Sequence, residues 1–271
     1  MTSRKQARRR REAASGAGWG IFLTALVATS LAGGYFAWSY ASSRVQIDEA
    51  TLCPEDGATG ATMVLLDLTD PLTRPQGDRL GTLLEKRVAE LPEGTMISFG
   101  VVGGDVRRRG SIFSSCKPAD GREASQIYEN PAMIKARFEE NFMVPLRAAL
   151  DEAMRAPEES HSPIMESLQA LIADTPEFET GEGPHDLVIV SDLLQNSEEI
   201  SFYRGEGWQT LEGRGGAGRL AGNLQDARVT IMRIPRPGAA SIPHEQVDDF
   251  WSRYFDRQGA RPPVVEALGD L

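Results

Sequence analysis

Residues 186–192 read Asp-Leu-Val-Ile-Val-Ser-Asp, a run of apolar side chains that closes with a carboxylate. No polar residue alternates within the run, and such a strand is typical of a parallel sheet that is buried on both faces. Residues 62–67, Thr-Met-Val-Leu-Leu-Asp, show the same pattern. The two strands predict a parallel sheet with Asp67 and Asp192 at its carboxyl edge, where open α/β sheets bind ligands.

Strands and helices alternate outward from these two runs. Further strands are predicted at 96–102, 111–113 and 229–234, and the turn between the first two predicts an antiparallel edge pair. Helices are predicted at 80–91, 134–154 with a kink or break at Pro145, 162–172 with Ser162 as its N-cap, 220–225 and 247–255. The alternation predicts one doubly wound α/β domain with a mostly parallel, Rossmann-like sheet.

Composition and charge place the chain among globular proteins. Its 271 residues are 41% hydrophobic and 25% charged, which allows a sizeable core. The formal net charge is −10, and because residues 1–12 carry +5, residues 13–271 carry −15. An acidic body argues against a nucleic-acid partner. Arginine greatly outnumbers lysine, a usage typical of GC-rich bacterial genomes.

The N-terminal region predicts a membrane anchor. Residues 13–43 carry no charged side chain, and 19–41 supply the roughly 20 apolar residues that a spanning helix needs. By the positive-inside rule, the basic tail of residues 1–18 stays in the cytosol. We expect a single-pass anchor in the cytoplasmic (inner) membrane, with the main domain periplasmic or extracellular. A signal peptide cleaved after Ser39-Tyr40-Ala41 and a buried core helix are the alternatives.

The rest of the chain divides into a stalk at 42–60, the α/β domain at 61–258 and a C-terminal tail at 259–271, whose position the sequence does not predict. Cys53 and Cys116 are the only cysteines. Both fall in the part expected outside the cytoplasm, where two cysteines usually pair. A disulfide would tie the stalk to the loop after the third strand; two unrelated buried thiols are the alternative.

Oxygen ligands gather at the predicted carboxyl edge. Asp67 and Thr69 follow the first strand, Asp192 closes the fourth, and Ser162 opens a helix. Carboxylates and hydroxyls are hard ligands of the kind that Mg²⁺ accepts while it keeps several waters. The four side chains together predict a metal site. Taken singly, Ser162 has a simpler interpretation as a helix cap, and the two acids as acceptors of backbone hydrogen bonds.

With these residues the chain resembles the von Willebrand factor type A domain over residues 61–258. That family has a similar order of strands and helices. Its metal-ion-dependent adhesion site uses Asp-x-Ser/Thr-x-Ser after the first strand, a Thr before a middle helix and an Asp that closes the fourth strand. The matching positions here are Asp67, Thr69, Ser162-Pro163 and Ser191-Asp192.

Pro71 departs from the family pattern, which has a second hydroxyl at this position. Asp70 or Thr73 is available to replace the lost ligand. The resemblance implies that Mg²⁺ or Mn²⁺ binds weakly or not at all. It also implies a non-enzymatic module that binds a protein partner of unknown identity, alone or as a subunit of an envelope assembly.

Residues 67–73 also resemble the nucleophile loop of haloacid-dehalogenase-type phosphohydrolases. In that chemistry Asp67 would attack phosphorus while Mg²⁺ screens the charge. The reaction also needs a lysine, and beyond Lys5 the chain has only Lys86, Lys117 and Lys135. Because lysines are so few, a Mg²⁺-dependent phosphohydrolase is the alternative function and not the first.

Two other motifs have plainer interpretations. Residues 213–218 fit GxGxxG by letter but follow no predicted strand, so we expect a flexible loop there. Arg107, Arg108 and Arg109 lie beside the short edge strand. We interpret them as solvated residues that protect this edge from pairing with another chain.

Overall fold

The computed structural model describes residues 19, 22–36, 38–39, 46–124, 129–235 and 242–268. The chain forms two compact units, Met1–Gln46 and Ile47–Leu271.

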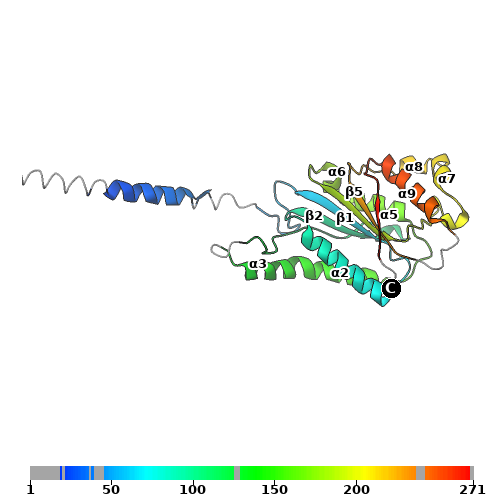
Figure 1. The fold of residues 1–271 in the computed structure, drawn as a ribbon, viewed down its shortest axis with the longest axis horizontal. Helices are drawn as coiled ribbons and strands as arrows, with labels where there is room; N and C mark the ends of the chain where they lie inside the picture. Colours follow the sequence, from blue (N-terminus) through cyan, green and yellow to red (C-terminus); the bar gives the residue numbers. More distant parts are fainter. Residues whose placement is uncertain are drawn as a thin grey trace, which may run out of the picture. The chain divides into compact units, whose positions relative to one another are not determined.

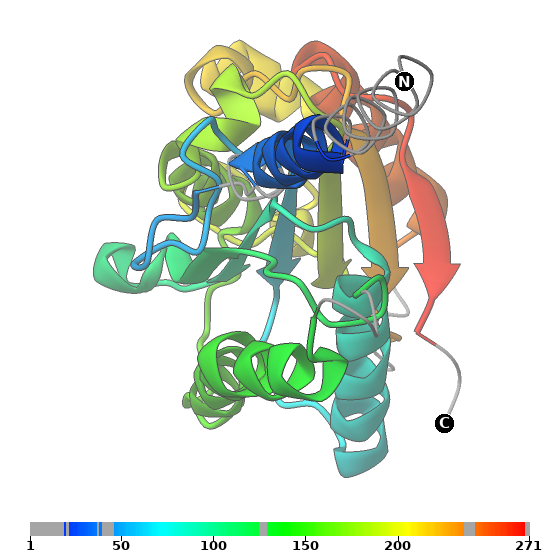
Figure 2. The ribbon, with the colours of Figure 1, turned by 90° about the vertical axis from the view of Figure 1, so that its left-hand side faces the viewer.

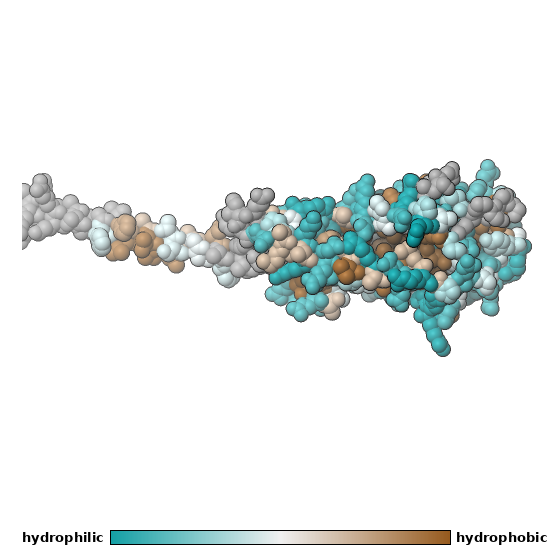
Figure 3. Space-filling model, turned by 90° about the horizontal axis from the view of Figure 1, so that it is seen from below, coloured by the Kyte–Doolittle hydropathy of each residue, from teal (hydrophilic) through white to brown (hydrophobic). Residues whose placement is uncertain are grey.

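In the first unit, residues 22–36 are helical, and their large apolar side chains are exposed (Figure 3). No helix within the described residues combines the length and the hydropathy that a membrane span requires. Residues 20, 21, 37, 40 and 41 of the predicted anchor lie outside the described residues.

The second unit is built on one mixed sheet. Within the described residues, six strands lie in the order β3-β2-β1-β4-β5-β6, and each neighbouring pair is parallel except β2 with β3. The strands are β1 (Gly60–Leu66), β2 (Thr95–Val101), β3 (Ser111–Cys116), β4 (His185–Ser191), β5 (Arg228–Arg233) and β6 (Val264–Ala267). The mostly parallel sheet with one antiparallel edge strand is confirmed.

Helices cover both faces of this sheet (Figure 1). One face carries α2 (Arg74–Glu90), α3 (Pro131–Phe138) and α4 (Val144–Met154). The other carries α5 (Ile164–Ala173), α6 (Pro176–Thr180), α7 (Trp208–Gly213), α8 (Gly216–Arg219) and α9 (His244–Arg257). Side chains of β1 alternate between the two cores: Met63 and Leu65 pack on one face, Val64 and Leu66 on the other. Both faces of β1 are therefore buried, as its continuous apolar run predicts.

The helix does not break at Pro145: residues 131–154 are helical without a gap, and the irregular turn lies just before the proline. A wide helical turn, η2 (Glu139–Met143), separates α3 from α4, and the amide of Val144 donates to the carbonyl of Glu139. Proline has no amide to donate, and its ring crowds the preceding turn. A single wide turn of this kind keeps both helices in one continuous rod.

The structure places the C-terminal tail, whose position the sequence did not predict: β6 pairs in parallel with β5 at the edge of the sheet (Figure 2), and Leu268 is buried. One segment differs from the sequence prediction. The glycine-rich stretch is not one flexible loop, because it contains the end of α7 and all of α8, whereas no helix forms at 220–225. Buried Leu211 and Ala217 hold these short helices on the sheet, and this tertiary packing outweighs the weak helical propensity of glycine.

The predicted disulfide is confirmed. Cys53 and Cys116 are bonded with their Cα atoms 4.7 Å apart, and Cys116 is the last residue of β3 rather than part of the loop after it. The amide of Cys116 donates to the carbonyl of Thr51 at 2.8 Å. Asp48 accepts from the Thr51 amide at 2.8 Å, which lowers the pKa of its carboxyl. The segment from Ile47 onward thus belongs to the compact unit, although the sequence placed it in the stalk.

We predict that removing the disulfide weakens the second unit substantially. The bond closes a loop with a sequence separation of 63. In Cys53→Ala/Cys116→Ala, urea unfolding should give a free energy of unfolding lower by roughly 2–4 kcal/mol, because the unfolded chain regains loop entropy. Dithiothreitol should lower the wild type to the level of the double variant and leave the double variant unchanged. Equal stability of the oxidised wild type and the double variant would contradict this role.

Candidate functional site

Asp67 lies at the centre of the carboxyl edge. It follows β1 directly, its amide donates to the carbonyl of Val190 at 2.8 Å, and the residue is only 3% exposed. Parallel pairing of β1 with β4 brings the ends of both strands to this edge. The sheet thus places a carboxylate where little water can reach it.

Three hydroxyl groups donate to the Asp67 carboxylate. Thr69 Oγ1 donates to Oδ1 at 2.6 Å, while Ser162 Oγ and Ser191 Oγ donate to Oδ2 at 3.0 and 2.7 Å. The Thr69 amide adds a fourth bond to Oδ1 at 3.3 Å. Each carboxylate oxygen therefore accepts two hydrogen bonds, which offset the cost of burying the charge.

The network continues into the loop after β4. Ser191 Oγ accepts from the Leu193 amide at 2.8 Å, and the Leu193 carbonyl accepts from Trp251 Nε1 at 2.9 Å. Leu193 has a φ of 67°, a left-handed conformation that costs a branched side chain energy. The two hydrogen bonds and the complete burial of Leu193 hold this bend, so the turn away from β4 depends on the same hydroxyl that contacts Asp67.

Of the four predicted ligands, Thr69 and Ser162 contact Asp67 directly. Asp192 directly follows Ser191, whose hydroxyl donates to Asp67, and its own Oδ1 accepts from the Leu194 amide at 2.8 Å. The ligands predicted from the sequence did not include Ser191, although the Ser-Asp pair at the end of the strand could have indicated it.

Ser162 is not the helix cap that the sequence predicted. α5 begins at Ile164, and its N-cap residue, Pro163, makes no capping bond. The amide of Met165 instead donates to Oε1 of buried Gln195 at 3.0 Å. Because Gln195 caps the helix from the loop after β4, the Ser162 hydroxyl is left to donate to Asp67.

Backbone bonds join three loops around this network. The Ser162 amide donates to the Asn196 carbonyl at 2.9 Å, and the Asn196 amide donates to the Ser162 carbonyl at 2.8 Å. The Glu159 amide donates to the Thr69 carbonyl at 3.0 Å. We call loops 67–73, 102–110, 155–163 and 192–207 the rim. Further out in the rim, the guanidinium of Arg204, followed by the Ser201 amide and Arg214, lowers the pKa of Glu206 to about 2, so its ion pairs persist below the pH at which an ordinary glutamate becomes protonated.

The site's chemistry fits a hard cation with few charged ligands. A hydroxyl that donates a hydrogen bond to Asp67 keeps its lone pairs for a metal, and the carboxylate behind it supplies negative charge. Thr73, which the sequence offered as a substitute for the missing ligand, caps α2 with its hydroxyl, which accepts from the Gln76 amide at 3.4 Å. Pro71 is exposed, and its side chain carries no ligand atom. Within the described residues, no three His, Cys, Asp or Glu side chains gather as a metal cluster.

The lysines required for phosphohydrolase chemistry lie elsewhere. Lys117 donates to the Leu91 carbonyl at 2.7 Å and pairs with Asp120, at the amino edge of the sheet. Lys86 lies within α2 near Glu90, and Lys135 lies within α3. In the part of the chain that the structure describes, no lysine contacts Asp67.

Comparisons with known proteins add little to this geometry. No protein-family model matches the chain, and no curated protein matches it. Among solved structures, the chain is similar to the crystal structure of an aerotolerance-related membrane protein from Bacteroides fragilis that carries multiple mutations to serine. That match has 12% sequence identity, covers 78% of this chain and 91% of the other, and has a TM-score of 0.35. The functional conclusion therefore rests on the chain's own residues.

Proposed function

We propose that this chain is a membrane-tethered binding module, similar to a von Willebrand factor type A domain, that binds a protein partner through its rim as part of an envelope assembly. The Asp67 network carries the proposal. It joins the ends of β1 and β4 to the loop before α5, and these are the three places where the family pattern has its ligands. The order of the strands from β1 to β5 supports this resemblance, while α6 and β6 are additional elements.

The same network argues against the phosphohydrolase alternative. A nucleophilic carboxylate must present a free lone pair to phosphorus, but each oxygen of Asp67 already accepts two hydrogen bonds in a site that is 3% exposed. The lysine that would stabilise the developing negative charge is missing from the described contacts of Asp67. A fixed, buried carboxylate is better suited to holding loops in place than to attacking a substrate.

The tether is proposed from the N-terminal sequence. Residues 13–43 carry no charge, the helical residues 22–36 expose apolar side chains, and a basic tail precedes them. The disulfide supports an oxidising compartment for the second unit, because such bonds are rare in the cytosol. We place the anchor in the cytoplasmic membrane with the second unit outside it.

We also propose that Thr69, Ser162 and Asp192, with Asp67 behind them, hold Mg²⁺ or Mn²⁺ weakly. Added Mg²⁺ should raise the melting temperature by about 1–3 °C, because a ligand that binds only the folded chain stabilises it by mass action. The rise should be larger in Pro71→Ser, which restores the hydroxyl, and absent in Asp192→Ala.

Asp78→Ala is the matched control, since Asp78 is an exposed carboxylate on nearby α2 and should not affect the rise. If Mg²⁺ and Mn²⁺ leave the melting temperature of the wild type and of Pro71→Ser unchanged, the cation proposal is wrong. The Asp67 network would then act through its hydrogen bonds alone.

Site-specific photo-crosslinking in source-cell spheroplasts tests the binding function. A photoreactive residue replaces exposed Val106 in the rim or, as the control, exposed Met133 on α3. We expect a discrete adduct with a membrane or envelope protein from position 106 and none from position 133, because only the rim is expected to meet the partner. Adducts from position 133 alone, or from neither position, would contradict a rim-binding module.

A further inference from the structure

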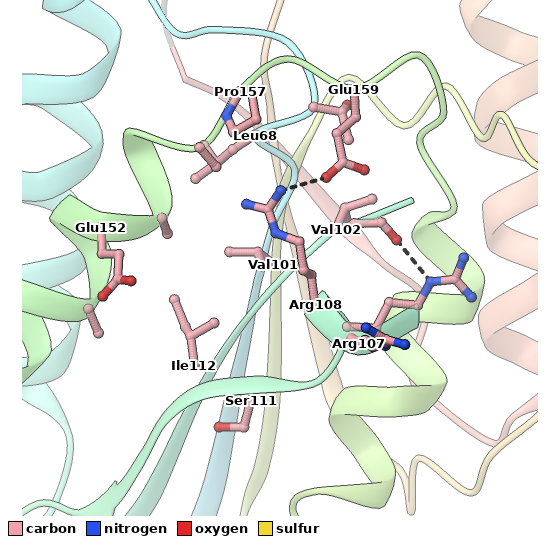
Figure 4. Close-up of a pocket in the computed structure, with 16 residues that line it drawn as sticks. Leu68, Val101, Val102, Arg107, Arg108, Ser111, Ile112, Glu152, Pro157 and Glu159 are labelled. Carbon is pink, nitrogen blue, oxygen red and sulfur yellow. Dashed lines mark hydrogen bonds and ion pairs between the residues drawn. The ribbon is translucent and has the colours of Figure 1, made fainter. Parts of the chain in front are cut away.

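A pocket of about 360 Å³ opens in the rim beside the Asp67 network (Figure 4). It lies between the end of β2, the start of β3, the last turns of α4 and the loop that follows β1. The volume falls within the roughly 300–1,000 Å³ of typical ligand pockets. Thr69 belongs to its lining, so the pocket and the Asp67 network share a wall.

The floor of the pocket is apolar. Leu68, Val101 and Ile112 are half-buried and contribute aliphatic side chains, and Ala149 and Ala153 form the wall on α4. Small alanines at these two helix positions leave room that larger side chains would fill. Such a surface favours an aliphatic side chain, because burying it removes apolar area from water.

The opposite wall is basic, and two of its arginines are held in place. Arg109 donates through Nε to the Gly103 carbonyl at 2.9 Å and through a terminal nitrogen to the Gly104 carbonyl at 3.1 Å. Arg108 pairs with Glu159 at 3.2 Å (Figure 4), and the Gly104 amide also donates to Glu159. The sequence interpretation of these arginines as solvated side chains was therefore wrong for Arg109, which is half-buried, whereas Arg108 is exposed.

Arg107 differs from its two neighbours. Its amide donates to Asp105, which fixes the backbone of the short helix η1 (Val106–Arg108), while its side chain is exposed. Within the described residues, the guanidiniums of Arg107 and Arg109 pair with no carboxylate. Three arginines thus face the pocket against two glutamates, Glu152 and Glu159, in a body that is strongly acidic overall.

We propose that this pocket binds an acidic segment of the protein partner, with a carboxylate on Arg107 and a neighbouring aliphatic side chain on the floor formed by Val101 and Ile112. The inference rests on the proposed function and names its partner chemistry. The acidic body repels an acidic segment elsewhere, so complementary charge steers the segment to this pocket. The fixed backbone of η1 presents Arg107 before binding, which reduces the entropy cost of ordering the site.

The probe is a phage-displayed random peptide library, selected on the full chain in detergent. We expect the enriched peptides to place Asp or Glu beside Leu, Ile, Val or Met. Affinity for a synthetic enriched peptide, measured by fluorescence anisotropy, should fall at least about tenfold in Arg107→Glu, because the substitution reverses the charge at the proposed contact. Arg137→Glu is the charge-matched control: Arg137 is exposed on α3, outside the pocket lining, and its substitution should leave affinity unchanged.

A second pair of variants tests the floor of the pocket. Ala153→Leu fills the pocket and should abolish binding, whereas Ala148→Leu places the same side chain on an exposed face of α4 and should not. Both variants should melt cooperatively, because leucine is a strong helix former.

Several results would overturn the proposal. One is a selection that enriches no peptides, and another is enrichment of peptides without acidic residues. A third is peptide affinity in Arg107→Glu and Ala153→Leu that equals the affinity in their controls. Repeating the photo-crosslinking from position 106 in Arg107→Glu separates this failure from failure of the proposed function. An undiminished adduct would keep the binding module and discard the acidic segment.

Discussion

The buried carboxylate of Asp67 is the interaction on which the carboxyl edge depends. A charge that is 3% exposed requires hydrogen-bond donors, and here three hydroxyls and one amide supply them from the ends of β1 and β4 and the loop before α5. Removing any donor leaves part of the charge uncompensated. Because an uncompensated buried charge destabilises the fold, this network keeps the three segments together. The same arrangement shapes the pocket beside Thr69.

The amino ends of the parallel strands, opposite to the Asp67 network, are held by a disulfide bond. The disulfide joins Cys53 to the end of β3, and the Thr51 carbonyl accepts the amide of Cys116, so the segment that enters the domain is held against the edge strand. The second unit thus has a rigid amino edge and a carboxyl edge ordered by hydrogen bonds. A binding module benefits from this division, because a surface fixed before association loses less entropy when it binds.

Much of this architecture could be predicted from local patterns. The apolar runs at 62–67 and 186–192 predict buried parallel strands, and two cysteines in one expected compartment predict the disulfide. The edge position of β6 could not be predicted, since it depends on pairing with β5, about thirty residues earlier in the chain. Ser162 matched a helix start by its sequence context, but buried Gln195 from another loop caps that helix. Arg109 has an ordinary surface sequence context, and only the folded loop brings the Gly103 carbonyl to its guanidinium.

A double-mutant cycle between Thr69→Val and Ser162→Ala tests the central claim most directly. These hydroxyls lie on different loops and share one acceptor group, the Asp67 carboxylate. If that carboxylate joins the loops, urea unfolding should show a coupling free energy of about 0.5–3 kcal/mol between the two substitutions. Thr69→Val combined with Thr82→Val, which removes an exposed hydroxyl on α2, should be additive. Additive effects of Thr69→Val and Ser162→Ala, each within about 0.5 kcal/mol of the wild type, would contradict the account.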